Sequence, residues 1–260
     1  MVSTDRPVAT PTPSLFVGTS SHRGDISRYA KRFNLLEMST EPGRHPKRAR
    51  LLDLRRAVAP DFVFSIVAPS ALASLESGEA TEGLVERAES VAEALGATWW
   101  VLRTPPNVTP SARSLRTFEA LVTRLKARQR RIAWEPRGIW RDEEAAGVAR
   151  SLGLTLVRDL LREDLISDDP VVYTRIRALG EGAHVGAAGA ERIAERLADA
   201  TSAYVVIEGS GAVAAQRILQ EAFGVPAPEA DEAESDGMLD DEGESLDGEG
   251  GEDEEEDSLE

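Results

Sequence analysis

Charged side chains stand at the ends of several short apolar segments of this chain, and they are the residues best able to do chemistry. Four are acids and four are arginines: Glu37, Glu135, Asp159 and Glu208, with Arg103, Arg137, Arg175 and Arg177. An arginine fork can hold a phosphate or carboxylate group through two hydrogen bonds, and a carboxylate can act as a general acid or base. Because burying one charge alone is costly, each of these residues needs a partner or a ligand.

These residues allow two interpretations. In the first, they line a pocket for a small anionic ligand that bears phosphate or carboxylate, where Arg137 and Arg175 orient the ligand. Glu135 is then the candidate catalytic acid or base. In the second, the acids and arginines neutralise one another as a structural network, and the protein is a non-catalytic scaffold or binds a protein partner. The residues by themselves leave open whether the protein is an enzyme.

No cofactor is predicted. The chain has no cysteine and three histidines, which excludes thiolate metal sites and a histidine-rich metal centre. A divalent metal such as Mg²⁺ or Mn²⁺, held by the carboxylate oxygens of Glu135, Asp159 and Glu208, stays an alternative.

Short apolar runs alternate with longer amphipathic runs from residue 15 to about residue 225, and this alternation decides where the charges lie. Eight apolar runs, several rich in β-branched residues, are typical of buried parallel strands: residues 15–20, 35–39, 62–68, 98–104, 131–136, 154–160, 171–176 and 203–208. Between them, apolar residues recur at spacings of three and four, which predicts helices at 48–58, 84–96, 111–128 and 190–200.

Eight strands alternating with helices predict a compact parallel (β/α)8 TIM barrel, near the lower size limit of that fold. An open doubly wound sheet is the alternative, although no GxGxxG motif follows the first strand. Side chains alternate along a strand, so Glu135 and Arg137 share one face, and Arg175 and Arg177 share another. If these faces point inward, the charged residues meet at the C-terminal mouth, where barrels build their sites.

A glycine-rich turn follows the last predicted strand. Gly209 and Ser210 come directly after Glu208 and precede a helix that begins near Ala212. Barrels often bind phosphate after strands seven and eight, at the start of such a helix. We therefore include Gly209 and Ser210 among the candidate ligand-binding residues.

The strand-end motifs, read in order, resemble those of the YecE-like family, the domain of unknown function 72, over nearly all of residues 15–225. The matching residues are Gly18-Thr19-Ser20, Tyr29-Ala30 with Phe33, Glu37, Ala68-Pro69, Pro105-Pro106, Glu135 with Arg137 and Trp140, Asp159, and Tyr173 with Arg175. The resemblance implies a TIM barrel and supplies no activity.

The chain departs from the family pattern at several strand ends. A lysine of the family is replaced by Val67, a glutamine by Arg103 and a histidine by Arg177, and Glu208-Gly209-Ser210 stands in place of Asn-Asn-Asp. The resemblance therefore implies a divergent member in which several pocket residues differ from those of the family.

The net charge of −16 comes from one end of the chain. Residues 227–260 contain 18 of the 46 acids and none of the 30 basic residues, which leaves 28 acids against 30 bases in residues 1–226. We expect disordered segments at 1–14 and at 226–260, on either side of a barrel domain at 15–225. The acidic tail could bind a basic protein partner.

Nothing in the chain predicts a membrane or nucleic-acid partner. No apolar run is long enough to span a bilayer, and no secretory signal is recognisable. The absence of cysteine is consistent with a cytoplasmic protein. The basic segment at 44–56 is explained by an amphipathic helix with a solvated face, and the balanced charge of the body makes nucleic acid an improbable partner.

Overall fold

The computed structural model describes residues 14–22, 24–75, 80–166, 169–177 and 184–225. The predicted disordered segments lie outside the described residues, except for Ser14, which begins the first strand. The described residues belong to one compact unit.

Eight strands form one parallel sheet. They are β1 (Ser14–Thr19), β2 (Leu35–Ser39), β3 (Val63–Val67), β4 (Trp99–Thr104), β5 (Arg131–Pro136), β6 (Thr155–Leu156), β7 (Val171–Arg177) and β8 (Ser202–Glu208). Seven of these match the predicted strands to within one residue at either end. The sixth was expected at 154–160 and is much shorter, because the chain turns at Asp159, whose carbonyl accepts hydrogen bonds from the backbone N–H groups of Arg162 and Glu163.

The order of the strands is that of a closed barrel. Hydrogen-bonded neighbours run β6-β5-β4-β3-β2-β1-β8-β7, and a parallel bridge between Arg158 and Thr174 joins the two remaining edges. The N–H of Arg175 donates to the carbonyl of Arg158 at 3.2 Å across this join. The fold is therefore a TIM barrel, as predicted, and the doubly wound alternative is wrong.

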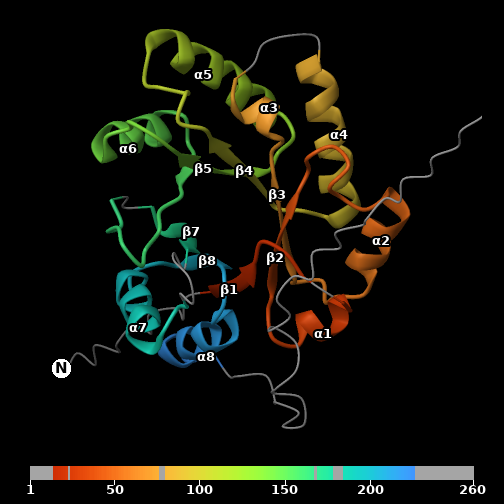
Figure 1. The fold of residues 1–260 in the computed structure, drawn as a ribbon, viewed down its shortest axis with the longest axis vertical. Coiled ribbons are helices and arrows are strands. Elements are labelled where there is room, and N and C mark those ends of the chain that lie inside the picture. Colours follow the sequence, from red (N-terminus) through yellow and green to blue (C-terminus); the bar gives the residue numbers. More distant parts are fainter. Residues whose placement is uncertain (1–13, 23, 76–79, 167–168, 178–183, 226–260) are drawn as a thin grey trace, which may run out of the picture. The chain divides into compact units, whose positions relative to one another are not determined.

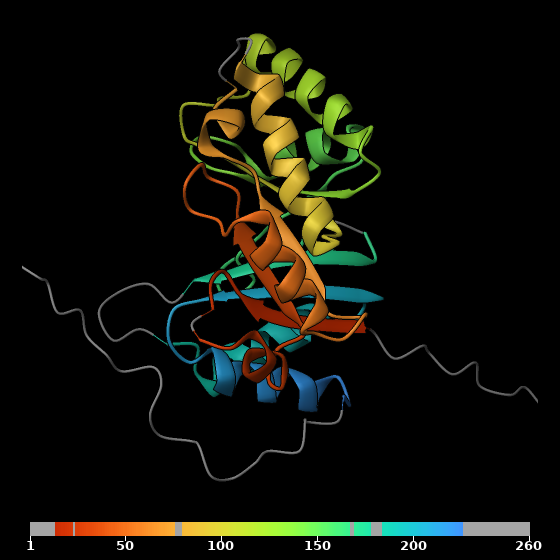
Figure 2. The same cartoon turned by 90° about the vertical axis from the view of Figure 1, so that its right-hand side faces the viewer.

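Helices lie outside the strands (Figures 1 and 2). They are α1 (Ile26–Ala30), α2 (Arg48–Arg56), α3 (Ser70–Ala73), α4 (Ala80–Leu95), α5 (Ala112–Lys126), α6 (Asp142–Ser151), α7 (Ala187–Arg196) and α8 (Ala212–Ala222). Ser111 caps α5 by accepting a hydrogen bond from the N–H of Ser114 at 3.2 Å. No helix joins β6 to β7 in the part of that connection that the structure describes.

The sheet separates two apolar layers. Interior side chains, among them Leu35, Trp99, Val101 and Tyr173, fill the lower part of the barrel. The Trp99 ring lies 5.2 Å from the ring of Tyr173, edge to face. Its neighbour Trp100 points the other way and packs under the helices, as alternation along a strand requires. This apolar floor leaves only the upper layer of the barrel for charged residues.

Candidate functional site

The upper layer of the barrel brings seven predicted residues together. They lie on five strands, β2, β4, β5, β7 and β8, or, for Arg137, directly after β5. We call them the arginine cluster: Glu37, Arg103, Glu135, Arg137, Arg175, Arg177 and Glu208. Neighbouring strands in register set the arrangement, since Arg103 pairs with Glu135 and Arg177 pairs with Glu208 across the sheet. Parallel strands place residues far apart in sequence at one level of the barrel.

Arg175 is the centre of the arginine cluster. Its side chain is 0% exposed, and each of its three nitrogens lies on a carboxylate. Nε donates to Glu135 at 2.9 Å, Nη1 to Glu208 at 2.6 Å, and Nη2 to both oxygens of Glu37 at 2.5 Å. The hydroxyl of Tyr173 donates to Glu37 at 2.9 Å. Burial acts to lower the pKa of Arg175, but Glu37 and Glu135 outweigh it and raise the pKa above its usual value.

Glu135 forms ion pairs with all four arginines of the cluster. One carboxylate oxygen faces Arg175 and, at 3.1 Å, Nε of Arg103; the second faces Nε of Arg137 at 3.2 Å and an Nη atom of Arg177. Burial acts to raise the pKa of Glu135, but the four arginines outweigh it, Arg175 most strongly, and hold the pKa below its usual value. Glu135 is therefore an ionised carboxylate at neutral pH.

The arginine cluster carries one positive charge in excess, since four arginines face three glutamates. Arg177 and Arg103 also reach Glu208, at 3.3 and 3.8 Å. Burial lowers the pKa of Arg103, and the nearby Arg175 lowers it further. The arginines are thus held close enough to repel one another, which is a source of affinity for an anion.

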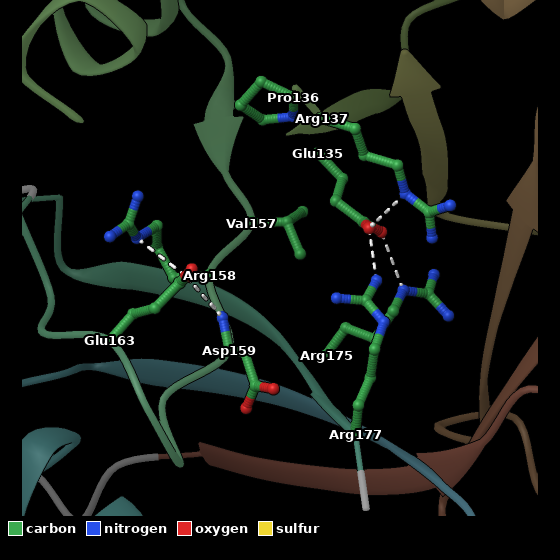
Figure 3. Close-up of a pocket in the computed structure, with 9 residues that line it drawn as sticks. All are labelled: Glu135, Pro136, Arg137, Val157, Arg158, Asp159, Glu163, Arg175 and Arg177. Atoms are coloured by element: carbon green, nitrogen blue, oxygen red, sulfur yellow. Dashed lines mark hydrogen bonds and ion pairs between the residues drawn. The ribbon is translucent and has the colours of Figure 1, made fainter. Parts of the chain in front are cut away.

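A cavity of about 90 Å³ lies beside the arginine cluster. Its lining residues come from the ends of β5, β6 and β7: Glu135, Pro136, Arg137, Val157, Arg158, Asp159, Glu163, Arg175 and Arg177. Figure 3 shows the arginines around Glu135 on one side and the side chains of Arg158, Asp159 and Glu163 on the other, with Val157 between the two groups.

Asp159 lines this cavity but stands apart from the arginine cluster. Its carboxylate, 8% exposed, pairs with Arg162 at 2.6 Å and accepts a hydrogen bond from the N–H of Leu161 at 3.2 Å. Glu163 accepts from the N–H of Asp159 at 3.0 Å. Asp159 therefore belongs to the turn after β6 and not to the group around Glu135.

Two charged residues of the cavity, Arg158 and Glu163, were not predicted from the sequence. Arg158 holds Asp142 with two contacts of 2.7 and 2.9 Å and lies 3.1 Å from a carboxylate oxygen of Glu163. Both Arg158 and its neighbour Asp159 line the cavity because β6 has ended before them. Strand alternation places such neighbours on opposite faces, so no sequence signal pointed to Arg158 or Glu163.

Gly209 and Ser210 do not line the cavity. They lie at the exposed end of β8, where Ser210 forms a bridge with His184. The next residue, Gly211, precedes α8 with φ +84°, and a Cβ there would come within 3.1 Å of the backbone nitrogen of Val185. The glycine-rich turn thus allows a close approach of the chain itself.

A metal centre is not supported. Among the described residues, no three histidine, aspartate or glutamate side chains are grouped so that they could hold a metal ion. Of the carboxylates in the metal alternative, Glu135 and Glu208 face arginines of the cluster, whereas Asp159 faces Arg162. Each is already neutralised by a guanidinium.

The fold and its arginine-lined mouth define a (β/α)8 barrel with a small polar cavity. The chain belongs to a family described as proteins of unknown function, DUF72, whose model matches residues 14–232. No match was found among curated proteins. None of the described helices is long and apolar enough to cross a membrane.

Solved structures agree with the barrel. A DUF72 family protein from Enterococcus faecalis is similar with a TM-score of 0.63 at 15% identity, over 84% of this chain and 100% of that one. A DUF72 family protein from Thermotoga maritima gives 0.57 at 16%, over 81% and 99%. D-psicose 3-epimerase from Clostridium cellulolyticum gives 0.52 at 14%, over 81% and 97%. At such identities the likeness shows the shared fold alone.

Proposed function

We propose that the barrel mouth binds a small anion, a phosphate or carboxylate group, in the cavity beside the arginine cluster. The observation that carries the proposal is the excess of one positive charge in the arginine cluster, of which Arg137, Arg175 and Arg177 line this cavity. In a partly buried site, a positive charge without a matching carboxylate is satisfied best by an anionic ligand.

Arg137 and Arg177 are the best placed to contact the anion. The side chain of Arg137 is 44% exposed and meets Glu135 through Nε. The hydrogen bond of its guanidinium in the described part of the chain comes from Nε. Arg175, in contrast, is fully buried with every nitrogen on a carboxylate. In this proposal Arg175 positions the glutamates, and the more exposed Arg137 and Arg177 bind the anion.

The size of the cavity limits the ligand. The volume of this cavity, about 90 Å³, is small. A single phosphate or carboxylate group suits that space, whereas drug-sized ligands occupy about 300–1,000 Å³. A larger ligand would have to extend out of the mouth.

In this proposal Glu135 has a structural role in place of the acid–base role that its position suggested. All four arginines face its two oxygens, and its pKa lies below the usual value. A general base works best with a pKa near the working pH and a free lone pair directed at the substrate. These contacts support an anchor that holds the arginines in place.

An NMR titration of the arginine Nε–H signals tests the proposal. Sodium phosphate and sodium acetate are added at constant ionic strength, so that screening does not change. We expect saturable shifts in wild type, and at least a fivefold loss of affinity in Arg137→Gln. The matched control is Arg116→Gln, an exposed arginine on α5, which should bind as wild type does.

Two results would refute the proposal. The first is the absence of saturable shifts with either anion, which would favour the structural scaffold. The second is an equal loss of affinity in Arg137→Gln and Arg116→Gln, since the anions would then be sensing general surface charge.

A further inference from the structure

The cavity has a second wall of opposite charge. We call it the acidic cluster: Asp142, Arg158, Asp159, Arg162 and Glu163, which are joined by three ion pairs and by the hydrogen bond from the N–H of Asp159 to Glu163. Three carboxylates face two arginines, so this cluster carries one negative charge in excess. Arg158, Asp159 and Glu163 line the cavity across from Arg137 and Arg177, on the far side of Val157 in Figure 3.

Glu163 is the residue of this wall with spare hydrogen-bonding capacity. One of its oxygens accepts from the N–H of Asp159 at 3.0 Å and lies 3.1 Å from Nε of Arg158. An ionised carboxylate has room for about four hydrogen bonds on two oxygens. The oxygens of Asp159, in contrast, already face Arg162 and the N–H of Leu161.

Arg158 stays in place without Glu163. It is held by two parallel contacts with Asp142, at 2.7 and 2.9 Å, and such a two-point contact fixes the guanidinium plane. Its carbonyl also accepts hydrogen bonds from Arg175 N–H and from the Thr174 hydroxyl, at 3.2 and 2.7 Å. Glu163 can therefore be removed while the rest of the wall is kept.

We propose that the ligand is two-headed: a short acid whose anionic group meets Arg137 and Arg177, and whose neighbouring hydroxyl or ammonium donates to Glu163. Positive and negative excess charge on opposite walls of one small cavity matches a ligand with an acceptor at one end and a donor at the other. A cavity of about 90 Å³, far smaller than the roughly 300–1,000 Å³ of pockets for drug-sized ligands, suits an acid with two or three carbon atoms. This inference rests on the proposed anion site and names its ligand class.

The experiment compares three probes that share a carboxylate. Acetate has no donor on its second carbon, glycolate has a hydroxyl there, and glycine has an ammonium. We expect glycolate or glycine to bind wild type about tenfold more tightly than acetate, because a hydrogen bond to a charged group contributes about one factor of ten or more. The same NMR titration at constant ionic strength provides the affinities.

Variants then assign the donor contact. Glu163→Ala should bring the affinity ratio of the better two-headed probe to acetate close to one. The matched control, Glu119→Ala on the exposed face of α5, should keep the wild-type ratio. Arg137→Gln should weaken all three probes.

The outcomes separate this inference from the anion site. If acetate, glycolate and glycine bind equally, the two-headed ligand is overturned while the anion site stands. If the preference persists in Glu163→Ala, the assignment to Glu163 is overturned. If none of the three acids and no phosphate binds, the anion site falls and this inference falls with it.

Discussion

Replacing Arg175 by methionine should destabilise the barrel strongly. Arg175 is 0% exposed and bonds three glutamates, but the loss falls unevenly on them. Glu135 keeps Arg103, Arg137 and Arg177, and Glu208 keeps Arg177. Among the described residues, Glu37, which is 1% exposed, keeps the hydrogen bond from the hydroxyl of Tyr173. The substitution therefore leaves one carboxylate buried without a cation.

The expected cost is about 3–5 kcal/mol, the usual penalty for removing one partner of a buried ion pair. For a domain of this size, a loss of about 1 kcal/mol lowers Tm by roughly 2–4 °C, so Tm should fall by about 10 °C. Urea and thermal unfolding followed by circular dichroism measure both quantities.

A double variant decides whether the cost comes from the orphaned charge. Arg175→Met with Glu37→Gln removes both partners, so it should recover more than half of the lost stability. The reasoning is refuted if the single variant costs less than about 1 kcal/mol, or if the double variant is no more stable than the single one. Either result would mean that Glu37 does not depend on Arg175 for its neutralisation.

Three further predictions concern the same layer of the barrel. Tyr173→Phe removes the hydroxyl that donates to Glu37 at 2.9 Å, so the free energy of unfolding should fall by about 2 kcal/mol; no change in the urea midpoint would contradict this. Gly18→Ala should cost about 3 kcal/mol or more, because the new Cβ would lie 1.7 Å from the carbonyl oxygen of Leu35, and a wild-type Tm would show that the strand can shift. The lowered pKa of Glu135 means that its ionised form stabilises the fold above the unfolded-state pKa of about 4.3, and that this contribution is lost as the pH falls through the lower folded-state value. As the pH falls below about 4.3, Glu135→Gln should therefore lose less stability than wild type. Urea unfolding at several pH values measures this, and an equal loss of unfolding free energy in both proteins would contradict the prediction.

The fold could be predicted well because hydrophobic pattern carries most of its signal. Buried parallel strands are continuous apolar runs, and seven of the eight were located to within one residue. The exception, β6, was predicted too long, because the run LTLVRDL continues to Leu160 although β6 ends at Leu156 and the chain turns at Asp159. A turn held by backbone carbonyls leaves little trace in side-chain pattern.

The arginine cluster could also be predicted in outline. Alternation along β5 and β7 put Glu135 with Arg137 and Arg175 with Arg177 on inward faces, and the barrel brings those faces together. The sequence pattern could not show which arginine would have all its nitrogens paired with carboxylates. Arg175 and Arg137 have equivalent positions in the sequence argument, yet one is fully buried on three carboxylates and the other is 44% exposed.

The role of the glycine-rich turn in ligand binding stays a prediction. Gly209 and Ser210 do not line the cavity beside the arginine cluster, and the neighbouring Gly211 packs against Val185. A glycine in the sequence indicates only that another group comes close to its backbone. Whether that backbone belongs to the protein or makes room for a ligand is decided by the fold.

By itself the sequence determined the number of strands, their inward faces and the types of charge at the mouth, because these follow from local alternation of apolar and polar residues. Only the tertiary structure decided the pairing of the charges, the excess of one positive charge beside Glu135, and the opposing wall formed by Arg158 and Glu163. The physical reason is that ion pairing depends on distances of a few ångströms between residues up to 138 positions apart in the chain. Closure of the barrel creates those distances.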